Sequence, residues 1–156
     1  MKFAFAVSAE NTFENQHFGD ADKFLLFEWA DGAFTLLGEE PNPFKGQHGH
    51  HGGQVHHHPN GQHGHGHGQH KKAALVTAFF QERGVQALVS RQFGHNIREV
   101  CRSFVPILVS ESAVDAVCQR LEEHIEGIAA EAGRDTEKHL VLRALEGELI
   151  RIAVKD

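Results

Sequence analysis

The chain has 156 residues, 40% of them hydrophobic and 12 of them phenylalanine, and its net charge is −6 with neutral histidines. This length and apolar content predict one domain with a core and exclude intrinsic disorder of the whole chain. An acidic chain lacks the basic face typical of nucleic-acid binders, and no apolar run approaches the roughly 18–20 residues that span a bilayer. We therefore predict a cytoplasmic protein that binds neither nucleic acid nor membrane.

The first 45 residues predict three strands. Residues 2–7 form a short, nearly continuous apolar run, which is typical of a strand covered on both faces. After a loop rich in turn-forming residues, two β-prone segments at 23–30 and 33–38 flank Asp31-Gly32. Because Asp-Gly between apolar runs favours a tight turn, these two segments predict a β-hairpin.

A helix is predicted over residues 72–83. Gly84 follows it, and glycine is the typical residue just after a helix end. Apolar side chains at helical spacing should form the buried face of this helix. They are Leu75, Val76, Phe79 and Phe80.

Two later helices are each expected to begin at a capping box. Asn96 and Glu99 have the required spacing, and so do Ser112 and Asp115. The second of these should open the longest helix of the chain, which we expect to end near Ala132. Strands are predicted between the helices at 85–90 and 106–109, and a second hairpin at 138–145 and 148–154.

The predicted order is βββ, then αβαβα, then ββ. It indicates an α/β fold in which helices cover the faces of a mixed sheet. Strands that are joined through helices should be parallel to each other. We expect an α/β domain over residues 1–134 and a C-terminal hairpin appendage over residues 135–156.

Residues 46–70 differ in composition from the rest of the chain. They contain 10 His, 8 Gly and 4 Gln in 25 residues, with no Lys, Arg, Asp or Glu. This segment has too little apolar area to offset the entropy that its many glycines would lose on ordering. We therefore predict a flexible loop inserted in the domain.

The histidines of this loop predict metal binding. Neutral imidazole is a common ligand of transition metals, and repeated His-Gly-His lets neighbouring rings reach one ion. The expected ligands of a divalent metal such as Ni, Cu, Zn or Fe are His48, His50, His51, His56, His57, His58, His63, His65, His67 and His70. The alternative is a linker with incidental histidines, or a non-specific metal store.

Several short motifs, in a fixed order along the chain, resemble those of a known family. They are the strand at 1–7, His17-Phe18-Gly19 before the strand at 24–28, the 40–43 region ahead of the His/Gly-rich loop, residues 83–89, Gly94 at a helix start, and 104–109 before a helix near 112–114. Over roughly residues 1–125 the chain is similar to the dinitrogenase iron–molybdenum cofactor biosynthesis family, the small proteins similar to NifX, NafY and the C-terminal part of NifB. The tail beyond about Arg134 has no counterpart in the minimal family domain, which suggests an added edge hairpin or an association surface for a homodimer.

The resemblance implies a ribonuclease-H-like α/β fold without the nuclease carboxylates. It also implies that the protein binds an iron–molybdenum or iron–sulfur type cluster, or a precursor, as part of nitrogen fixation. Its partners would be cluster assembly proteins or an acceptor metalloenzyme. The cofactor-binding residues carried over are His17, Phe18, Gly19, Gly94, His95 and Asn96.

These six residues belong to two loops that the predicted topology brings together. Ligands of open α/β sheets bind beyond the carboxyl ends of the strands, so the loops should converge if the first strand lies beside the fourth. Two imidazoles and free backbone N–H groups at a helix start would suit an anionic metal–sulfur cluster. The alternative is that His17 only caps or staples its own loop.

Three functions follow from these patterns. The first is a non-enzymatic carrier of metal or metal–sulfur clusters, and the second is a metal-homeostasis chaperone or store that acts through the His-rich loop alone. The third, a hydrolase, has the least support, because no carboxylates gather at strand ends and no Gly-x-Ser-x-Gly is present. We therefore expect no catalytic residue, and we expect Cys101 and Cys118 to be buried as small apolar side chains.

Overall fold

The computed structural model describes residues 1–45 and 65–155, and within these ranges seven strands form one mixed sheet. The strand order is β3-β2-β1-β4-β5-β6-β7. The pairings of β4 with β5 and of β5 with β6 are parallel, which confirms the prediction for strands joined through helices, and β1 also pairs with β4 in parallel. The strands are β1 (Lys2–Val7), β2 (Lys23–Ala30), β3 (Ala33–Pro41), β4 (Val85–Ser90), β5 (Val105–Leu108), β6 (Val141–Leu145) and β7 (Glu148–Ile152).

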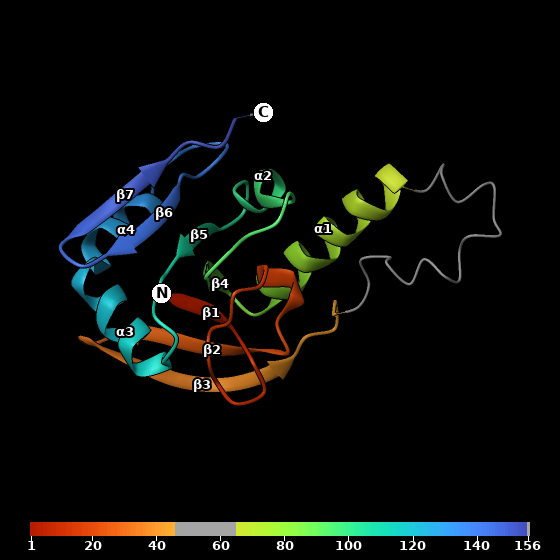
Figure 1. Cartoon of the computed structure of the whole chain (residues 1–156). Helices are drawn as coiled ribbons and strands as arrows, with labels where there is room; N and C mark the ends of the chain where they lie inside the picture. The colour runs from red at the N-terminus through yellow and green to blue at the C-terminus, as the bar shows by residue number, and fades with distance from the viewer. Residues whose placement is uncertain (46–64, 156) are drawn as a thin grey trace.

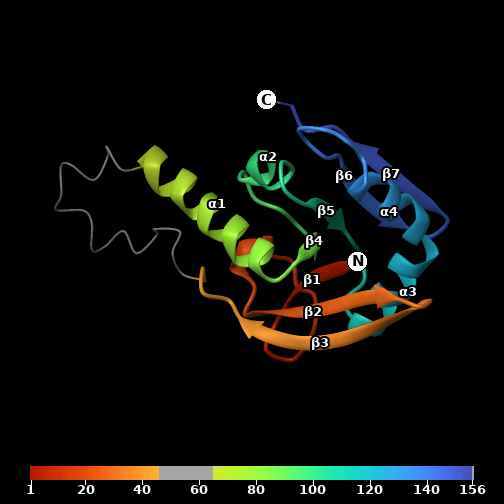
Figure 2. The ribbon, with the colours of Figure 1, turned by 180° about the vertical axis from the view of Figure 1, so that it is seen from behind.

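Helices lie on both faces of the sheet (Figures 1 and 2). One face carries α1 (His65–Glu82) and α2 (Ile97–Val100), and the other carries α3 (Val114–Glu123) and α4 (Ile125–Ala132). A single 3₁₀ turn, η1 (Phe18–Asp20), lies between β1 and β2. Within the described ranges, no helix combines the length and apolar character needed to cross a bilayer.

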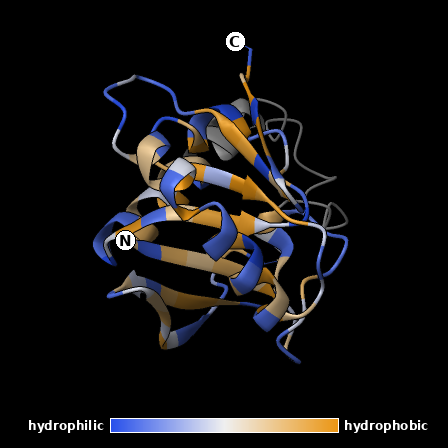
Figure 3. Cartoon of the chain, turned by 90° about the vertical axis from the view of Figure 1, so that its left-hand side faces the viewer, coloured by the Kyte–Doolittle hydropathy of each residue, from blue (hydrophilic) through white to orange (hydrophobic). Residues whose placement is uncertain are grey.

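The strand β1 separates two hydrophobic cores because successive side chains of a strand point to opposite faces. Phe3 and Phe5 are buried in the core beneath α3 and α4, whereas Ala4 and Ala6 are buried in the core beneath α1 and α2. The small alanines leave room there for the aromatic side chains of the helices and loops. Figure 3 shows the hydrophobic residues concentrated on the strands.

Both predicted hairpins are present. Asp31 and Gly32 have positive φ angles of 55° and 77°, as a two-residue turn with the twist of the flanking strands requires. The second hairpin pairs Leu145 with Glu148 around Gly147. Since β6 also pairs with β5, this second hairpin extends the same sheet.

The helix α1 begins at His65, earlier than the predicted start at residue 72. The last part of the predicted loop, residues 65–70, is therefore helical. Leu75 was expected on the buried face but is 48% exposed, whereas Val76 and Phe80 are buried as predicted.

The predicted capping boxes are wrong. Asn96 makes no side-chain cap hydrogen bond, and α2 ends after one turn at Val100. The helix expected to open at Ser112 begins at Val114 instead. Its N-cap residue is therefore Ala113, whose side chain cannot accept a hydrogen bond.

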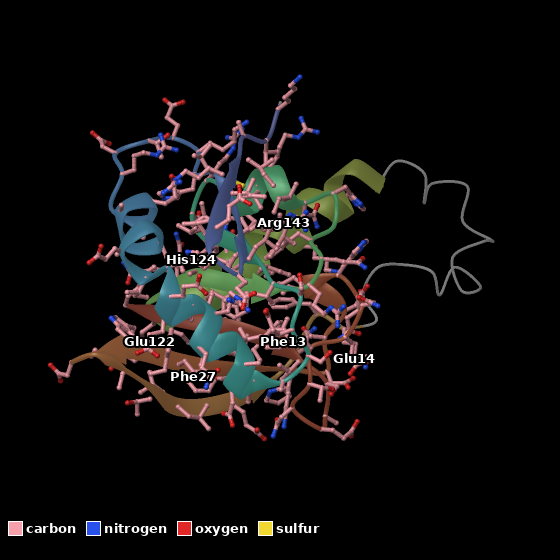
Figure 4. The ribbon with its side chains drawn as sticks, turned by 60° about the vertical axis from the view of Figure 1, so that its left-hand side comes forward. Phe13, Glu14, Phe27, Glu122, His124 and Arg143 are labelled. Atoms are coloured by element: carbon pink, nitrogen blue, oxygen red, sulfur yellow. The ribbon has the colours of Figure 1, made fainter. Side chains whose placement is uncertain are left out.

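The longest helix was also expected to run to Ala132 without a break, and this is wrong. His124 interrupts it with a backbone ψ of 16°, which separates α3 from α4. The ring of His124 bonds the carbonyl oxygen of Leu145, with Nε2 and O 2.7 Å apart. This contact with β6 gives the break a tertiary cause, and Figure 4 shows His124 between the two helices and the hairpin.

Candidate functional site

The loop after β1 and the turn after β4 are joined by backbone hydrogen bonding. His17 and Gln92 form a parallel β-bridge, and the N–H of Phe18 donates to the carbonyl oxygen of Gln92 at 2.9 Å. Because β1 and β4 are adjacent and parallel, their following loops leave the same edge of the sheet. The predicted convergence of these two loops is therefore observed.

The imidazole of His17 lies against Gly94. A Cβ added to Gly94 would lie 3.2 Å from Nδ1 of His17, closer than an ordinary contact. The side chain of His17 makes no cap hydrogen bond to η1, and both His17 and His95 are exposed. The ring is thus held at the surface by the turn, and capping does not explain its position.

Phe18 fixes the loop from beneath. It is 5% exposed and stacks on Phe24 and Phe93, with ring centroids 5.0 Å and 5.5 Å apart, and it meets the edge of Phe80 at 5.6 Å. Since Phe93 belongs to the β4–α2 turn, the stack ties the two loops through their side chains as well. Phe18 therefore positions the site from the core.

Gly19 lies beside two residues that the sequence reasoning missed. A Cβ on Gly19 would lie 3.7 Å from Nζ of Lys72, and the amide of Asn42 donates to the carbonyl oxygens of Gly19 and Ala21 at 2.9 Å and 2.7 Å. A solvated lysine on a helix carries no local signal for such a position. Lys72 adds a positive charge next to Gly19, two residues after His17.

Both described ends of the His-rich segment are attached to this region. On one side Phe44 is buried and meets the ring of Phe79 from α1 at 5.4 Å, and Lys45 pairs with Asp22. On the other side α1 carries Lys72 past Gly19. The segment therefore leaves and re-enters the fold beside the loop of His17.

The charge of Asp22 is stabilised at this attachment. The hydrogen bond from Lys45 and the bond from the N–H of Ala9, at 2.9 Å, hold the pKa of Asp22 below its ordinary value of 3.8. Asp22 is consequently ionised at neutral pH and holds Lys45 next to residues 19–22.

Neither cysteine is suited to bind a metal as a thiolate. Burial raises the pKa of Cys101 to about 11 and that of Cys118 to about 11, so both thiols stay protonated at neutral pH. Cys101 is fully buried, as predicted, and Cys118 is partly buried. Among the side chains of residues 1–45 and 72–155, no three His, Cys, Asp or Glu gather in a group that could hold a metal ion.

The predicted metal ligands of the His-rich segment are mostly outside the described residues. This holds for His48, His50, His51, His56, His57, His58 and His63, while His65, His67 and His70 belong to the first part of α1. The metal-binding prediction for these ten histidines stays a prediction.

A known family model covers the part of the chain that forms the candidate site. The model of the family described as dinitrogenase iron-molybdenum cofactor matches residues 1–124. The chain belongs to this family. The resemblance predicted from the sequence over about residues 1–125 is thereby confirmed, and membership connects the chain with the biosynthesis or binding of the iron–molybdenum cofactor. No curated protein and no solved structure matches the chain.

The boundary of the family match divides the structure unevenly. Both loops of the candidate site, the described ends of the His-rich segment and α3 lie inside it. The helix α4 and the hairpin of β6 and β7 lie outside. The candidate site is therefore built by the family domain alone.

Proposed function

We propose that the protein is a non-enzymatic carrier whose cargo is a metal or a metal–sulfur cluster of the iron–molybdenum or iron–sulfur type. It would receive this cargo from cluster assembly proteins or pass it to an acceptor metalloenzyme. Membership in the iron–molybdenum cofactor family supports this reading. The sheet order, with β1 between β2 and β4, supports the ribonuclease-H-like class that the resemblance implies.

The junction of the two loops is the observation that carries the proposal. His17 and His95 are exposed on adjoining loops, and the amine of Lys72 lies close to Gly19. Imidazole binds iron and related metals, while a nearby cation favours an anionic cluster. We propose His17, Phe18, Gly19, Gly94, His95 and Asn96 as the seat, in which the ring of Phe18 anchors the loop from the core.

The His-rich segment would collect metal for this seat. Its flanking residues Lys45 and Lys72 are held next to Asp22 and Gly19, so captured ions would be released close to His17. Imidazole-rich sites follow the Irving–Williams order, so in competition we expect copper or nickel to bind more tightly than zinc or iron.

The carrier would consist of a family domain and a C-terminal hairpin. We treat residues 1–134 as the carrier domain and residues 135–156 as an appendage, which the end of the family match at residue 124 supports. The parallel pairing of β6 with β5 makes this appendage continuous with the carrier sheet.

Anaerobic reconstitution with iron and sulfide tests the seat. We expect visible cluster absorbance in the full chain, and a loss of most of it in His17→Ala and His95→Ala. Asn15→Ala is the matched control, because Asn15 is an exposed residue of the same loop. Equal absorbance in all four proteins would refute the seat.

A second variant separates the carrier from a store that acts through the His-rich segment alone. Replacement of all ten histidines of residues 46–70 by glutamine keeps the length and polarity of the segment. We expect this variant to lose most uptake of nickel or zinc in calorimetry while it keeps the reconstituted cluster. Loss of the cluster together with the metal would favour the store.

A further inference from the structure

A pocket of about 360 Å³ lies where the β4–α2 turn meets the C-terminal hairpin. Its walls are largely apolar, and two arginines from different parts of the chain line it. Arg91 follows β4, and Arg143 belongs to β6. The apolar lining includes Ile97, Leu108, Val141 and Ile152.

The alternation of β6 explains why this pocket exists. Leu142 and Ala144 are buried in the core beneath α3 and α4, so Val141 and Arg143 lie on the other face of the sheet. On that face the neighbouring helix α2 has only four residues, too few to cover this part of the sheet. Figure 4 shows Arg143 on the side of the hairpin away from α4.

The two guanidinium groups carry charge that the described part of the chain does not neutralise. None of the ion pairs between described residues includes Arg91 or Arg143. Arg91 donates from Nη1 to the hydroxyl of Ser112 at 3.0 Å, a neutral partner that fixes its position. Arg143 is exposed.

We infer that this pocket binds a small aliphatic carboxylate. A guanidinium group presents N–H donors in a planar fork that matches a carboxylate with two parallel hydrogen bonds. The apolar walls would take up the hydrocarbon chain, which an inorganic anion could not use. The volume lies near the lower end of the roughly 300–1,000 Å³ typical of ligand pockets, so the ligand is small.

This inference goes beyond the proposed carrier function and does not depend on it. Val141, Arg143 and Ile152 lie outside the family match, so the pocket is a feature of this chain that the family domain alone does not build. The pocket does share Gln92 and Phe93 with the turn that holds His17. A bound carboxylate would therefore sit next to the cargo seat.

Titration of the full-length, cargo-free chain with hexanoate, followed by NMR, tests the assignment. We expect saturable shifts of the backbone amides of Ile97, Leu108 and Arg143. Hexanamide lacks the negative charge, and inorganic phosphate lacks the hydrocarbon chain. Each should therefore bind at least roughly tenfold more weakly than hexanoate, a difference in binding free energy of about 1.4 kcal/mol. Equal binding of hexanamide or phosphate, or the absence of saturable shifts with hexanoate, would overturn the proposal.

Two variants on the hairpin complete the test. Arg143→Gln should weaken hexanoate binding at least roughly tenfold, or about 1.4 kcal/mol. Arg151→Gln is the matched control, because Arg151 is an exposed arginine of the neighbouring strand whose guanidinium lies near Gly127 of α4, on the opposite face. Both side chains are exposed, so both variants should keep the fold. An equal effect of the two substitutions would contradict a site at Arg143.

The carboxylate titration and the cluster reconstitution test the two proposals independently, because no cluster is present in the titration. Failure of the titration would leave the carrier proposal intact, and failure of the reconstitution would leave the carboxylate proposal intact.

Discussion

The Nδ1 atom of His17 lies 3.2 Å from the point where a Cβ on Gly94 would stand. The two residues come from loops far apart in the sequence, and the ring uses the space that the glycine leaves open. The φ angle of Gly94 is not positive, so its backbone conformation does not require glycine. The position requires a small residue because the His17 ring approaches so closely.

Gly94→Ala should therefore move the ring of His17 with little effect on the fold. We expect the free energy of unfolding to change by at most about 0.5 kcal/mol. Binding of the reconstituted cluster should weaken roughly tenfold because the imidazole loses its position. Gly133→Ala is the control, since its Cβ would meet only the carbonyl oxygen of Ala129 at 3.5 Å. Unchanged cluster binding with a displaced His17 resonance would argue against His17 as a ligand.

Phe18→Ala should destabilise the whole fold, because Phe18 is buried among Phe24, Phe80 and Phe93. Removal of a buried phenylalanine ring costs about 3–5 kcal/mol. Urea unfolding followed by tryptophan fluorescence of Trp29 measures the loss. A cost near zero would mean that Phe18 does not hold the two loops together.

Much of the sheet could be predicted because its signals are local. The apolar run of β1 and the Asp31-Gly32 turn depend on neighbouring residues, and both are present as expected. The meeting of the two site loops followed from one topological condition, that β1 lies beside β4, and this pairing is observed. Local pattern and simple topology were sufficient for these features.

The remaining features depend on contacts between distant parts of the sequence. His124 breaks the predicted long helix while its ring bonds Leu145, 21 residues further along the chain. The position of Lys72 beside Gly19 likewise depends on how α1 packs over the loop. Helical periodicity contains no information about either contact, which is why both were missed.

The stability of the protein should fall in acid because of Glu131. This carboxyl is 4% exposed, and burial by itself raises its pKa. Hydrogen bonds from Arg134, His139 and the N–H of Leu140 outweigh burial and hold the pKa of Glu131 below its ordinary value of 4.5. A carboxyl whose pKa is lowered in the folded state stabilises that state above its unfolded pKa. This stabilisation is lost as pH falls from about 4.5 through the folded value.

Glu131→Gln checks this assignment. We expect a loss of about 1–3 kcal/mol at pH 7, since one buried charged partner of Arg134 and His139 is removed. The slope of stability against pH below 4.5 should flatten in the variant. Glu122→Gln is the control, because Glu122 is exposed on α3 (Figure 4). Thermal unfolding at several pH values would show parallel curves for wild type and Glu131→Gln if Glu131 were not responsible.

The cysteines should be poor nucleophiles in the folded protein. Burial raises the pKa of Cys101 to about 11 from an ordinary value of 9.0, so the thiolate fraction at pH 8 falls roughly hundredfold. Alkylation of Cys101 by iodoacetamide at pH 8 should therefore be at least that much slower in the native chain than in urea. Cys118 has an equally raised pKa but is partly exposed, so it should react slowly and before Cys101. If Cys101 reacted in the folded chain as fast as in urea, the thiol would be accessible, and burial would not be what protects it.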